Sequence, residues 1–392
     1  MKKIELLSPA GDMERLKVTL LYGADAVYIG GYKYGLRANA INFSKEEIKE
    51  ACNFAHKLNK KVYLTLNMVF HNEDIDGVYE YIDEVVNCGI DAFIISDPFL
   101  ISYIKNKYKD VEVHLSTQNS TTNYETVNYF KKKGIDRVVL ARELSREDIK
   151  EIIDKTNVDI EIFIHGAMCT FYSGRCALSN YVTNRDSNRG GCAQVCRFAF
   201  DIGKEQEFTF ATCDLNLSKY INDIINIGVR SLKVEGRMRT IYYLATVIGT
   251  YRKIIDACYN KELTKDFMDK QTKILNRVAN RETTTQYFDH LASDKDQYFS
   301  GRTEVSNQDY LSLITGYDYD NKMLIMKERN YFKPGDLVEI FTPSGKIYEL
   351  TIDKIYDEDN NLLDVARHPE QILKIPFDKE LEEYSMIRLK VK

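Results

Sequence analysis

Four cysteines lie within one short segment of the chain, HGAMCTFYSGRCALSNYVTNRDSNRGGCAQVCR, which spans residues 165–197. Their spacing is Cys169-x6-Cys176-x15-Cys192-x3-Cys196. Four thiolates can hold a tetrahedral zinc ion or an iron–sulfur cluster. Structural zinc sites are usually built from two CxxC pairs, which this segment lacks, and the wider spacing favours a group larger than one ion. The spacing predicts a [4Fe–4S] cluster, with zinc and reduced, metal-free thiols as the alternatives.

The residues between these cysteines suit an anionic cluster. Three glycines permit close backbone approach, and three arginines supply compensating charge: Gly174, Gly190, Gly191, Arg175, Arg189 and Arg197. Cys213 is an alternative to Cys196 as the fourth ligand, because it ends a predicted hairpin that returns to the same face. The CxxxCxxC pattern of radical enzymes that use S-adenosylmethionine is absent, since the Cys192–Cys196 pair lacks the third member.

The chain is acidic overall but carries basic zones. Its formal net charge is −5, so the molecule as a whole is not a basic nucleic-acid binder. Residues 165–200 hold four arginines against Asp186, and residues 230–239 hold four Lys or Arg against Glu235, so each stretch has a net charge of +3. Such local zones attract an anionic substrate.

Neither a membrane span nor a signal peptide is expected. No run of about 18 apolar residues is present. The first residues, MKKIELLSPAGDMERL, lack the apolar stretch and the cleavage site of a signal peptide. We therefore expect a cytoplasmic protein with no membrane partner, in which thiols stay reduced and are free to bind metal.

Short β-rich runs alternate with helical patterns over the first 240 residues. The eight runs are 4–8, 25–31, 61–67, 91–97, 111–117, 136–141, 160–166 and 231–236. Two of the helices begin with capping boxes, at Ser44 with Glu47 and at Ser145 with Asp148. Strands rich in Val and Ile that alternate with helices predict a parallel sheet covered by helices. Eight units fit a TIM-like (β/α)8 barrel, and an open doubly wound sheet is the alternative.

The interval between the seventh and eighth runs is longer than the others. It holds the cysteine segment, a predicted hairpin and a helix over 214–228, so we interpret about 167–213 as an insertion on the catalytic face of the barrel. Residues 240–300 are predicted to be helical. From about 305 the chain turns to short alternating strands, which predict a small antiparallel β-barrel. The expected domains are 1–300, with the insertion and trailing helices, and 305–392.

Polar residues follow nearly every predicted strand, where a barrel carries its catalytic groups. For acid–base chemistry the candidates are His165, Glu143 and Glu235, with a buried core histidine as the alternative for His165. Lys233, Glu235 and Arg237 alternate along one strand and share one side, which suits recognition of a carboxylate or phosphate. A mutual salt-bridge network is the alternative there. Gln118 and Asn67 end two further strands and are candidate binding residues.

Three stretches resemble one known family. EIFIHGAMCTFYSGRCALS with NRDSNRGGCAQVCR, together with LLSPAGDMERLKVTLLYGADAVYIGG and SLKVEGRMRTIYY, closely resemble the signature stretches of the U32 family, long called collagenase-like peptidases. The resemblance covers most of 1–300, and the β-rich tail is similar to the C-terminal domain of some members. It implies a TIM-like barrel with an iron–sulfur cluster, whose ligands fall on Cys169, Cys176, Cys192 and Cys196 or Cys213.

The resemblance also implies a reaction. Members of the family carry out oxygen-independent hydroxylation of tRNA wobble uridine using prephenate, of a ribosomal RNA cytidine, and of ubiquinone precursors. Length and the β-rich tail place this chain nearest the tRNA branch. Prephenate is a dicarboxylate, which suits Lys233 and Arg237 with Arg175 or Arg197 assisting. Expected partners are tRNA and either a U32 paralogue or another subunit. The alternatives are a peptidase acting on collagen-like peptides, although no protease constellation is recognisable, and a non-catalytic iron–sulfur subunit.

Overall fold

The computed structural model describes residues 3–36, 42–201, 203, 207–279, 281–298 and 309–390. Packing divides the chain into two compact units. The first comprises Met1–Leu20, Ala24–Arg239 and Arg281–Thr303, and the second comprises Leu21–Gly23, Thr240–Asn280 and Glu304–Lys392. The sequence places the helices of 240–280 with the first domain, whereas in the structure they pack within the second unit.

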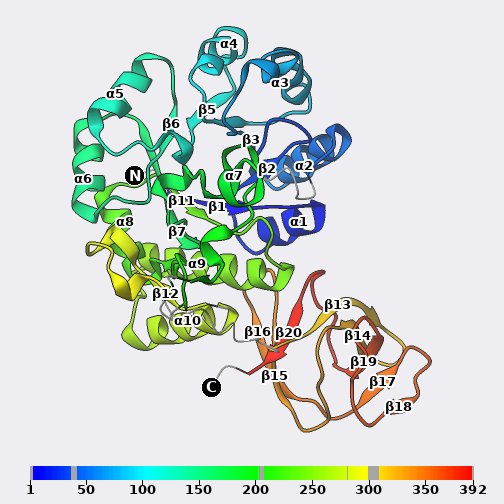
Figure 1. The fold of residues 1–392 in the computed structure, drawn as a ribbon. Helices are drawn as coiled ribbons and strands as arrows, with labels where there is room; N and C mark the ends of the chain where they lie inside the picture. Colours follow the sequence, from blue (N-terminus) through cyan, green and yellow to red (C-terminus); the bar gives the residue numbers. More distant parts are fainter. Residues whose placement is uncertain are drawn as a thin grey trace. The chain divides into compact units, whose positions relative to one another are not determined.

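The first unit contains a closed barrel of eight parallel strands, which confirms the predicted TIM-like fold (Figure 1). The strands are β1 (Glu5–Pro9), β2 (Ala26–Gly30), β3 (Lys61–Leu66), β4 (Ala92–Ile95), β5 (Glu112–Leu115), β6 (Arg137–Val139), β7 (Asp159–Gly166) and β11 (Ser231–Val234). They follow one another in the order β11-β1-β2-β3-β4-β5-β6-β7, and β11 also pairs with β7. This pairing closes the ring and rules out the open doubly wound sheet.

Helices follow most of the strands and cover the barrel (Figure 1). They are α1 (Met13–Leu21), α2 (Lys45–Lys57), α3 (Val78–Val86), α4 (Phe99–Lys107), α5 (Tyr124–Lys132), α6 (Arg146–Lys155) and α8 (Ile221–Ile227), with single turns η1 (Asn72–Asp74) and η2 (Thr117–Asn119). Both predicted capping boxes are present, at Ser44 with Glu47 and at Ser145 with Asp148. The helices bury their apolar faces on strands that are almost wholly buried, such as β2 and β4.

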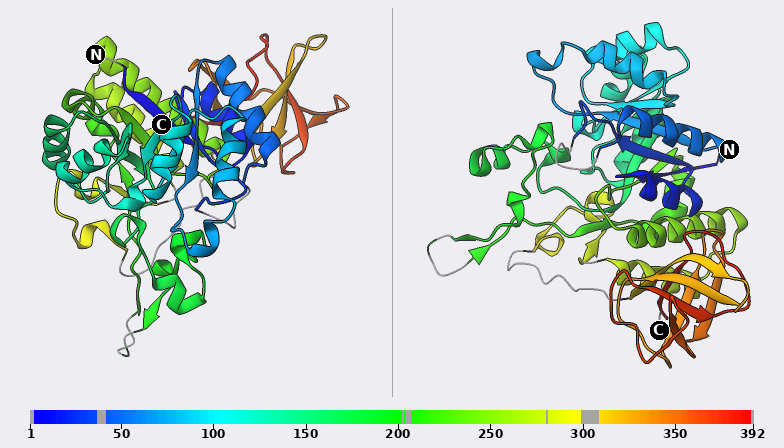
Figure 2. Two further views of the ribbon diagram at one scale, coloured as in Figure 1. Left: turned by 90° about the horizontal axis from the view of Figure 1, so that it is seen from above. Right: turned by 90° about the vertical axis from the view of Figure 1, so that its right-hand side faces the viewer.

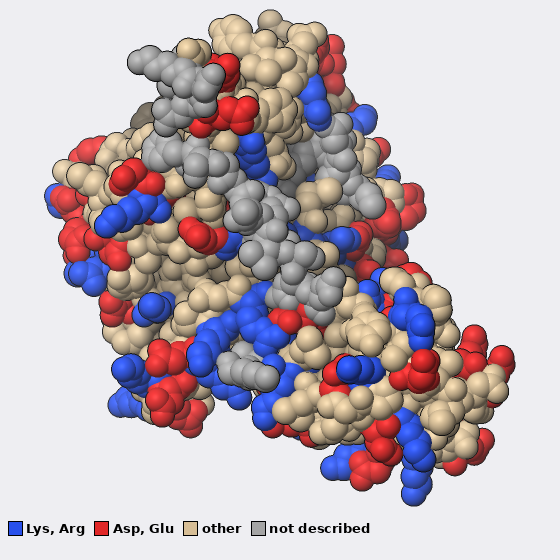
Figure 3. All heavy atoms as spheres, turned by 60° about the horizontal axis from the view of Figure 1, so that its bottom comes forward, with Lys and Arg blue, Asp and Glu red and all other residues tan. Residues whose placement is uncertain are grey.

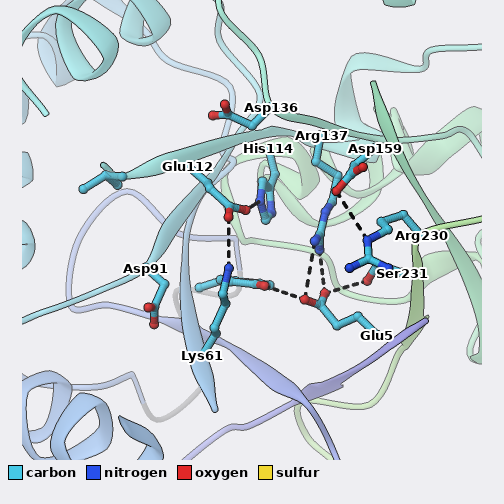
Figure 4. A network of polar contacts seen from close by, with 12 residues as sticks. Glu5, Lys61, Asp91, Glu112, His114, Asp136, Arg137, Asp159, Arg230 and Ser231 are labelled. Atoms are coloured by element: carbon cyan, nitrogen blue, oxygen red, sulfur yellow. Dashed lines mark hydrogen bonds and ion pairs between the residues drawn. The ribbon is translucent and has the colours of Figure 1, made fainter. Parts of the chain in front are cut away.

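Ion pairs occupy the barrel interior near the N-terminal ends of the strands. We call them the inner network, and Figure 4 shows part of it. The Nη1 atom of Arg137 lies 2.6 Å from Glu5 and 3.1 Å from Glu161. Glu161 also pairs with Lys233 at 3.0 Å. Burial works to raise the pKa of Glu161, but the Lys233 and Arg137 cations outweigh it and hold that pKa low, at about 2. Glu161 is therefore ionised and fully paired.

The same network continues through Glu112, which lies 2.9 Å from both Lys61 and His114 (Figure 4). Burial lowers the pKa of His114, and the Arg137 cation lowers it further, so this imidazole is neutral. Three carboxylates then face three cations, namely Glu5, Glu112 and Glu161 against Lys61, Arg137 and Lys233. The network is electrically balanced.

The cysteine segment lies between β7 and β11, as predicted. It forms η3 (Tyr172–Gly174), α7 (Leu178–Thr183), η4 (Ser187–Arg189) and η5 (Val195–Arg197), followed by the predicted hairpin of β8 (Phe200–Asp201) and β9 (Glu207–Phe208). The structure differs from the helix expected over 214–228, because β10 (Asp214–Asn216) and η6 (Ser218–Tyr220) precede α8. β10 pairs antiparallel with the end of β7, whose eight residues reach past its barrel neighbours and would otherwise leave backbone groups unpaired.

Residues 281–298 add β12 (Thr283–Thr284), η7 (Gln286–Phe288) and η8 (Asp294–Asp296) to the first unit, and β12 pairs parallel to β10. The second unit combines α9 (Ile241–Asn260) and α10 (Lys265–Val278) with an antiparallel sheet of eight strands (Figure 2). These are β13 (Tyr310–Asp318), β14 (Met323–Glu328), β15 (Leu337–Phe341), β16 (Ile347–Thr351), β17 (Ile355–Asp357), β18 (Leu362–Leu363), β19 (Ile372–Pro376) and β20 (Met386–Leu389).

The sheet of the second unit packs around its own apolar core, to which nearly every strand contributes. β14 shows the alternation expected for a strand with one buried face: Leu324, Met326 and Glu328 are buried and the residues between them are partly exposed. Among the described residues, no helix is long and apolar enough to cross a membrane.

Candidate thiol centre and the adjoining cleft

The structure gathers the four clustered cysteines beyond the carboxyl end of β7. Cys169 and Cys192 are exposed, and Cys176 and Cys196 are partly exposed. Desolvation raises the pKa of Cys196, Arg197 lowers it, and the thiols of Cys192 and Cys176 raise it further. Although part of its surface reaches solvent, Cys169 also has a raised pKa, to which the atoms packed around it and the thiols of Cys192 and Cys196 contribute. Cys196 therefore lies within electrostatic reach of the other three thiols.

Cys213, the alternative fourth ligand, has different surroundings. It is buried, its thiol donates to the carbonyl oxygen of Lys295 at 3.9 Å, and its N–H donates to the carbonyl oxygen of Asp296 at 2.9 Å. Burial raises the pKa of its thiol, and the nearest polar influences are Tyr298 and Glu282. The geometry groups Cys196, rather than Cys213, with the other three thiols.

The thiols share a neighbourhood without meeting at one point. Over the ranges that the structure describes, no three His, Cys, Asp or Glu side chains are close enough together to hold one metal ion. The N–H of Leu178 donates to Sγ of Cys176 at 3.3 Å, a hydrogen bond that favours the thiolate. Arg142 and Arg197 lower the pKa of Cys169 and Cys196, respectively. This donor set suits a polynuclear, anionic group.

Asn188 and Arg189 fix the cysteine segment to the rest of the barrel. The Asn188 amide accepts from the N–H of Cys176 at 3.2 Å and donates to its carbonyl oxygen at 2.9 Å. The carbonyl oxygen of Asn188 in turn accepts from the N–H of Val69 at 2.9 Å, and Arg189 forms ion pairs with Glu73, at 3.2 Å, and Asp74. The position of Cys176 is thus tied to the loop that follows β3.

Glu143, Gln118 and Arg175 come together at the turn between Cys169 and Cys176. Glu143 accepts hydrogen bonds from the N–H and the hydroxyl of Ser173, at 2.5 and 2.7 Å. Ser173 has a φ of +47°, in the left-handed region that few non-glycine residues adopt. The Nε of Arg175 donates to the carbonyl oxygen of Gln118 at 2.9 Å. Here Glu143 and Gln118 hold the turn in place.

Arg142 is a site residue that the sequence analysis missed. Its guanidinium lies 3.8 Å from the centre of the Phe163 ring and 3.7 Å from the carboxylate of Glu235. Arg142 and Glu235 act on the pKa of Cys169 in opposite directions, Arg142 lowering it and Glu235 raising it. The signal was present, because Arg142 lies just after β6, beside the Glu143 that the strand-end criterion did find.

His165 lies where β7 pairs with both β11 and β10, opposite Val234 and Asn216. It is only 2% exposed. Burial, followed by the nearby Arg239 cation, lowers its pKa to about 3. The imidazole is therefore neutral at physiological pH, and its role in acid–base chemistry stays a prediction.

The sequence predicts that Lys233, Glu235 and Arg237 share one side of strand eight. In the structure these residues lie in different surroundings. Lys233 belongs to the inner network through Glu161. Arg237 is buried and donates to the carbonyl oxygen of Leu36 at 3.2 Å and to Asn42 at 2.8 Å. Asn67 contacts the same residue as Arg237, because the amide oxygen of Asn67 accepts a hydrogen bond from the N–H of Leu36 at 3.3 Å. Arg237 and Asn67 are brought together, and Lys233 is apart from them.

Three arginines surround Asp214 next to the thiol centre. Arg239 and Arg281 pair with the two carboxylate oxygens of Asp214 at 3.1 and 3.0 Å. The pKa of Arg197 is lowered, first by burial and then by the charge of Arg281, with Cys196 and Asp214 opposing. We call Arg197, Arg239, Arg281 and Asp214 the basic group, and its excess charge is +2. Arg281 was missed because it is 84 residues from Arg197 in the sequence.

The surface agrees with an acidic chain that carries local basic zones. Figure 3 shows Lys and Arg side chains gathered densely in one area of the face it draws, while elsewhere positive and negative side chains are mixed.

A cleft of about 530 Å³ opens beside Cys176. Its walls come from the ends of β4 and β5, the loop after β3 and the cysteine segment, and the lining residues are Val69, Ser96, Asp97, Pro98, Gln118, Asn119, Arg175, Cys176, Ala177 and Asn188. Pockets of this size hold small molecules or single nucleotides. The cleft brings the predicted Gln118 and Arg175 to one of the thiols, at the face where barrels carry their active sites.

The fold and the site together define a class of protein. It is a TIM-like barrel that carries four thiols beyond its seventh strand and is joined to an antiparallel β unit. The chain matches the model of peptidase family U32 over residues 11–298 and that of the U32 C-terminal domain over 306–388. It belongs to peptidase family U32.

The named relatives include both RNA-modifying proteins and proteases. The chain is 44% identical to tRNA hydroxylation protein P1 of Bacillus subtilis, over 99% of this chain and 95% of that protein. It is 37% identical to the 23S rRNA 5-hydroxycytidine C2501 synthase of Escherichia coli, over 65% of this chain and 40% of that protein. It is 33% identical to a collagenase of Porphyromonas gingivalis, over 88% of this chain and 84% of that protein.

Proposed function

We propose that this protein is an iron–sulfur-dependent, oxygen-independent RNA hydroxylase, and that its target is the wobble uridine of tRNA. The observation that carries the proposal is the grouping of four thiols beside a cleft and a basic group on the catalytic face of the barrel. The relative named for tRNA hydroxylation is similar over nearly the whole chain, whereas the ribosomal RNA enzyme is similar over only 65% of it. This difference favours tRNA.

Cys169, Cys176, Cys192 and Cys196 are the proposed ligands of a [4Fe–4S] cluster. A cluster held by these cysteines would supply electron-transfer chemistry for the hydroxylation. The spacing of the cysteines, which lacks the two CxxC pairs of most structural zinc sites, favours the cluster over zinc, the alternative. Arg142 and Arg197 supply positive charge beside the thiolates, and Leu178 donates to one of them.

The arginines of the site are proposed to bind anions. Arg197, Arg239 and Arg281 gather around Asp214, and guanidinium groups bind a dicarboxylate such as prephenate, or the phosphates of RNA, through paired hydrogen bonds. Arg175, at the rim of the cleft, is positioned through its bond to Gln118 to orient the same ligand. The size of the cleft suits one flipped-out nucleotide.

The test is nucleoside analysis of tRNA from a strain that lacks the gene and is complemented with variants. We expect the wild type and Cys213→Ala to restore 5-hydroxyuridine derivatives, and Cys192→Ser and Cys196→Ser to leave them at least tenfold lower. Anaerobically purified wild type is expected to be brown and iron-loaded. Undiminished 5-hydroxyuridine in the deletion strain, with no paralogue present, would reject the tRNA assignment. A colourless protein loaded with zinc would reject the cluster.

The similarity to a collagenase favours peptide hydrolysis as the second candidate function. The purified wild-type protein can be used to decide between RNA hydroxylation and peptide hydrolysis. Cleavage of gelatin by the purified wild type, retained after iron is removed by chelation, would support the peptidase. Assaying tRNA hydroxylation with the purified protein alone also tells whether a second subunit is required.

A further inference from the structure

The second unit holds a cavity of its own, well separated in sequence from the thiol centre. Its volume is about 310 Å³. The walls are formed by α9, α10, the turn that joins β15 to β16, and β20, together with Tyr22 and Gly23. All of these segments belong to the second unit. The side chains that matter to its chemistry are Thr246, Arg252, Lys253, Gln271 and Arg388.

One cation of this cavity has no counter-charge. Arg252 pairs with Asp256 at 2.8 Å, and Arg388 pairs with the buried Glu339 at 2.9 Å. Lys253 has no ion-pair or hydrogen-bond partner among the described residues. Burial lowers the pKa of Lys253, and the charges of Arg388 and Lys270 lower it further, against a weaker opposing effect of Glu339.

Positive charge is in excess around the cavity. The residues that line the cavity comprise three cations, Arg252, Lys253 and Arg388, and one carboxylate, Asp256, while the carboxylates of Glu339 and Glu382 lie behind the wall and bind Arg388 and the N–H of Ser344, respectively. A phosphate monoester carries a charge of about −1.5 to −2 at neutral pH and a phosphodiester only −1, so cations on the wall attract the monoester more strongly.

Two buried polar groups on the wall also lack partners. Thr246 is 3% exposed and Gln271 is 5% exposed. The hydroxyl oxygen of Thr246 and the amide oxygen of Gln271 make no hydrogen bond with the described residues. Such groups are rarely left unsatisfied in a folded protein, so each requires a partner inside the cavity. A hydroxyl accepts or donates and an amide oxygen accepts, so the complementary ligand carries hydroxyl groups as well as an anion.

We propose that this cavity binds a phosphate monoester carried on a sugar, the ribose 5′-phosphate unit of a nucleotide. The phosphate lies against Lys253 and Arg388, and the sugar hydroxyls bond to Gln271 and Thr246. The volume is that of a small-ligand pocket. Such a unit has two sources, a free mononucleotide or the 5′-phosphorylated end of an RNA chain. The site needs neither the thiols nor hydroxylation, so its failure and that of the proposed function are distinguishable.

The experiment is calorimetric titration of the full-length protein with inorganic phosphate, with UMP, and with one RNA oligonucleotide prepared with a 5′-phosphate or a 5′-hydroxyl. We expect the 5′-phosphate to improve the affinity for the oligonucleotide at least tenfold if RNA is the source, and UMP to bind with a similar dependence on Lys253 if a free nucleotide is the source. In either case Lys253→Met reduces the affinity of the phosphorylated ligand at least tenfold.

Two further variants complete the test. Thr246→Val keeps the shape of the side chain but removes the hydroxyl, and it is expected to weaken UMP or 5′-phosphorylated RNA more than inorganic phosphate. Lys273→Met is the matched control, since Lys273 is exposed on the same helix as Gln271 and does not line the cavity. The proposal is overturned if no phosphorylated ligand binds, or if Lys253→Met and Lys273→Met leave the affinity equally unchanged while Lys253→Met remains folded.

Discussion

Two groups of charged residues in the first unit differ in one respect, the balance of their charges. The inner network sets Glu5, Glu112 and Glu161 against Lys61, Arg137 and Lys233, of which Arg137, Glu161 and Lys233 are buried in the barrel. The basic group combines Arg197, Arg239 and Arg281 with Asp214. The formal charges of the first group cancel, whereas those of the four residues of the second sum to +2 beside the thiol centre.

This difference separates structure from function within one barrel. A buried network whose charges cancel needs no ligand, and it holds the strands that supply it together. Where several arginines lie close together, their mutual repulsion costs folding free energy, and residues held at such a cost are typical of binding sites. The lowered pKa of Arg197, caused first by burial and then by Arg281, reflects that cost.

The largest expected effect follows from unbalancing the inner network. Glu161→Gln removes the carboxylate that faces both Lys233 and Arg137, and leaves two buried cations with one partner fewer. Removing one member of a buried pair typically costs about 3–5 kcal/mol. We expect a loss of that size in the free energy of unfolding, measured by urea denaturation of the first-unit transition.

Glu151→Gln is the control for this measurement. Glu151 pairs with Lys155 on the exposed face of α6, where both side chains are about half exposed. Exposed pairs contribute about 0–1 kcal/mol. If the two variants lose similar amounts of unfolding free energy, the inner network does not stabilise the barrel as described.

A smaller effect, on function alone, is expected from the basic group. Arg197→Met removes a cation that is repelled by Arg281, so the free energy of unfolding stays the same or rises. If the group binds the anionic substrate, kcat/KM for tRNA hydroxylation falls about tenfold, equivalent to about 1.4 kcal/mol. Arg185→Met, an exposed arginine of the same segment, is expected to change neither quantity. A parallel loss of stability and activity in Arg197→Met would show that the basic group is structural.

The sequence predicted the barrel, its strand order and the position of the insertion, because alternating Val- and Ile-rich runs and capping boxes are local signals. It also identified the residues that end the strands. It could not predict which of them are paired: Lys233 and Arg237 alternate along one strand, yet one meets Glu161 and the other meets Leu36 and Asn42. Partners that lie far apart in the sequence, such as Arg281 for Asp214, become visible only in the folded chain.

The smallest expected effect compares one buried histidine from each region. Burial lowers the pKa of both His114, in the inner network, and His165, near the basic group, the latter to about 3. In the unfolded chain each titrates near pH 6.5, so below that pH the unfolded state binds the extra proton and the folded state is destabilised. Between pH 6.5 and 5.5 His165 is expected to remove about 1 kcal/mol from the free energy of unfolding, and His114 acts in the same direction.

His165→Gln tests this directly, because it removes one titrating group and leaves the other. We expect the loss of unfolding free energy between pH 6.5 and 5.5 to be about 1 kcal/mol smaller in His165→Gln than in the wild type, which urea denaturation at several pH values resolves. His56→Gln is the control, since His56 is exposed on α2 and pairs with Asp91 at 3.0 Å. An unchanged slope in His165→Gln would mean that His165 takes up a proton in the folded state, and would return it to consideration as the acid–base residue of the site.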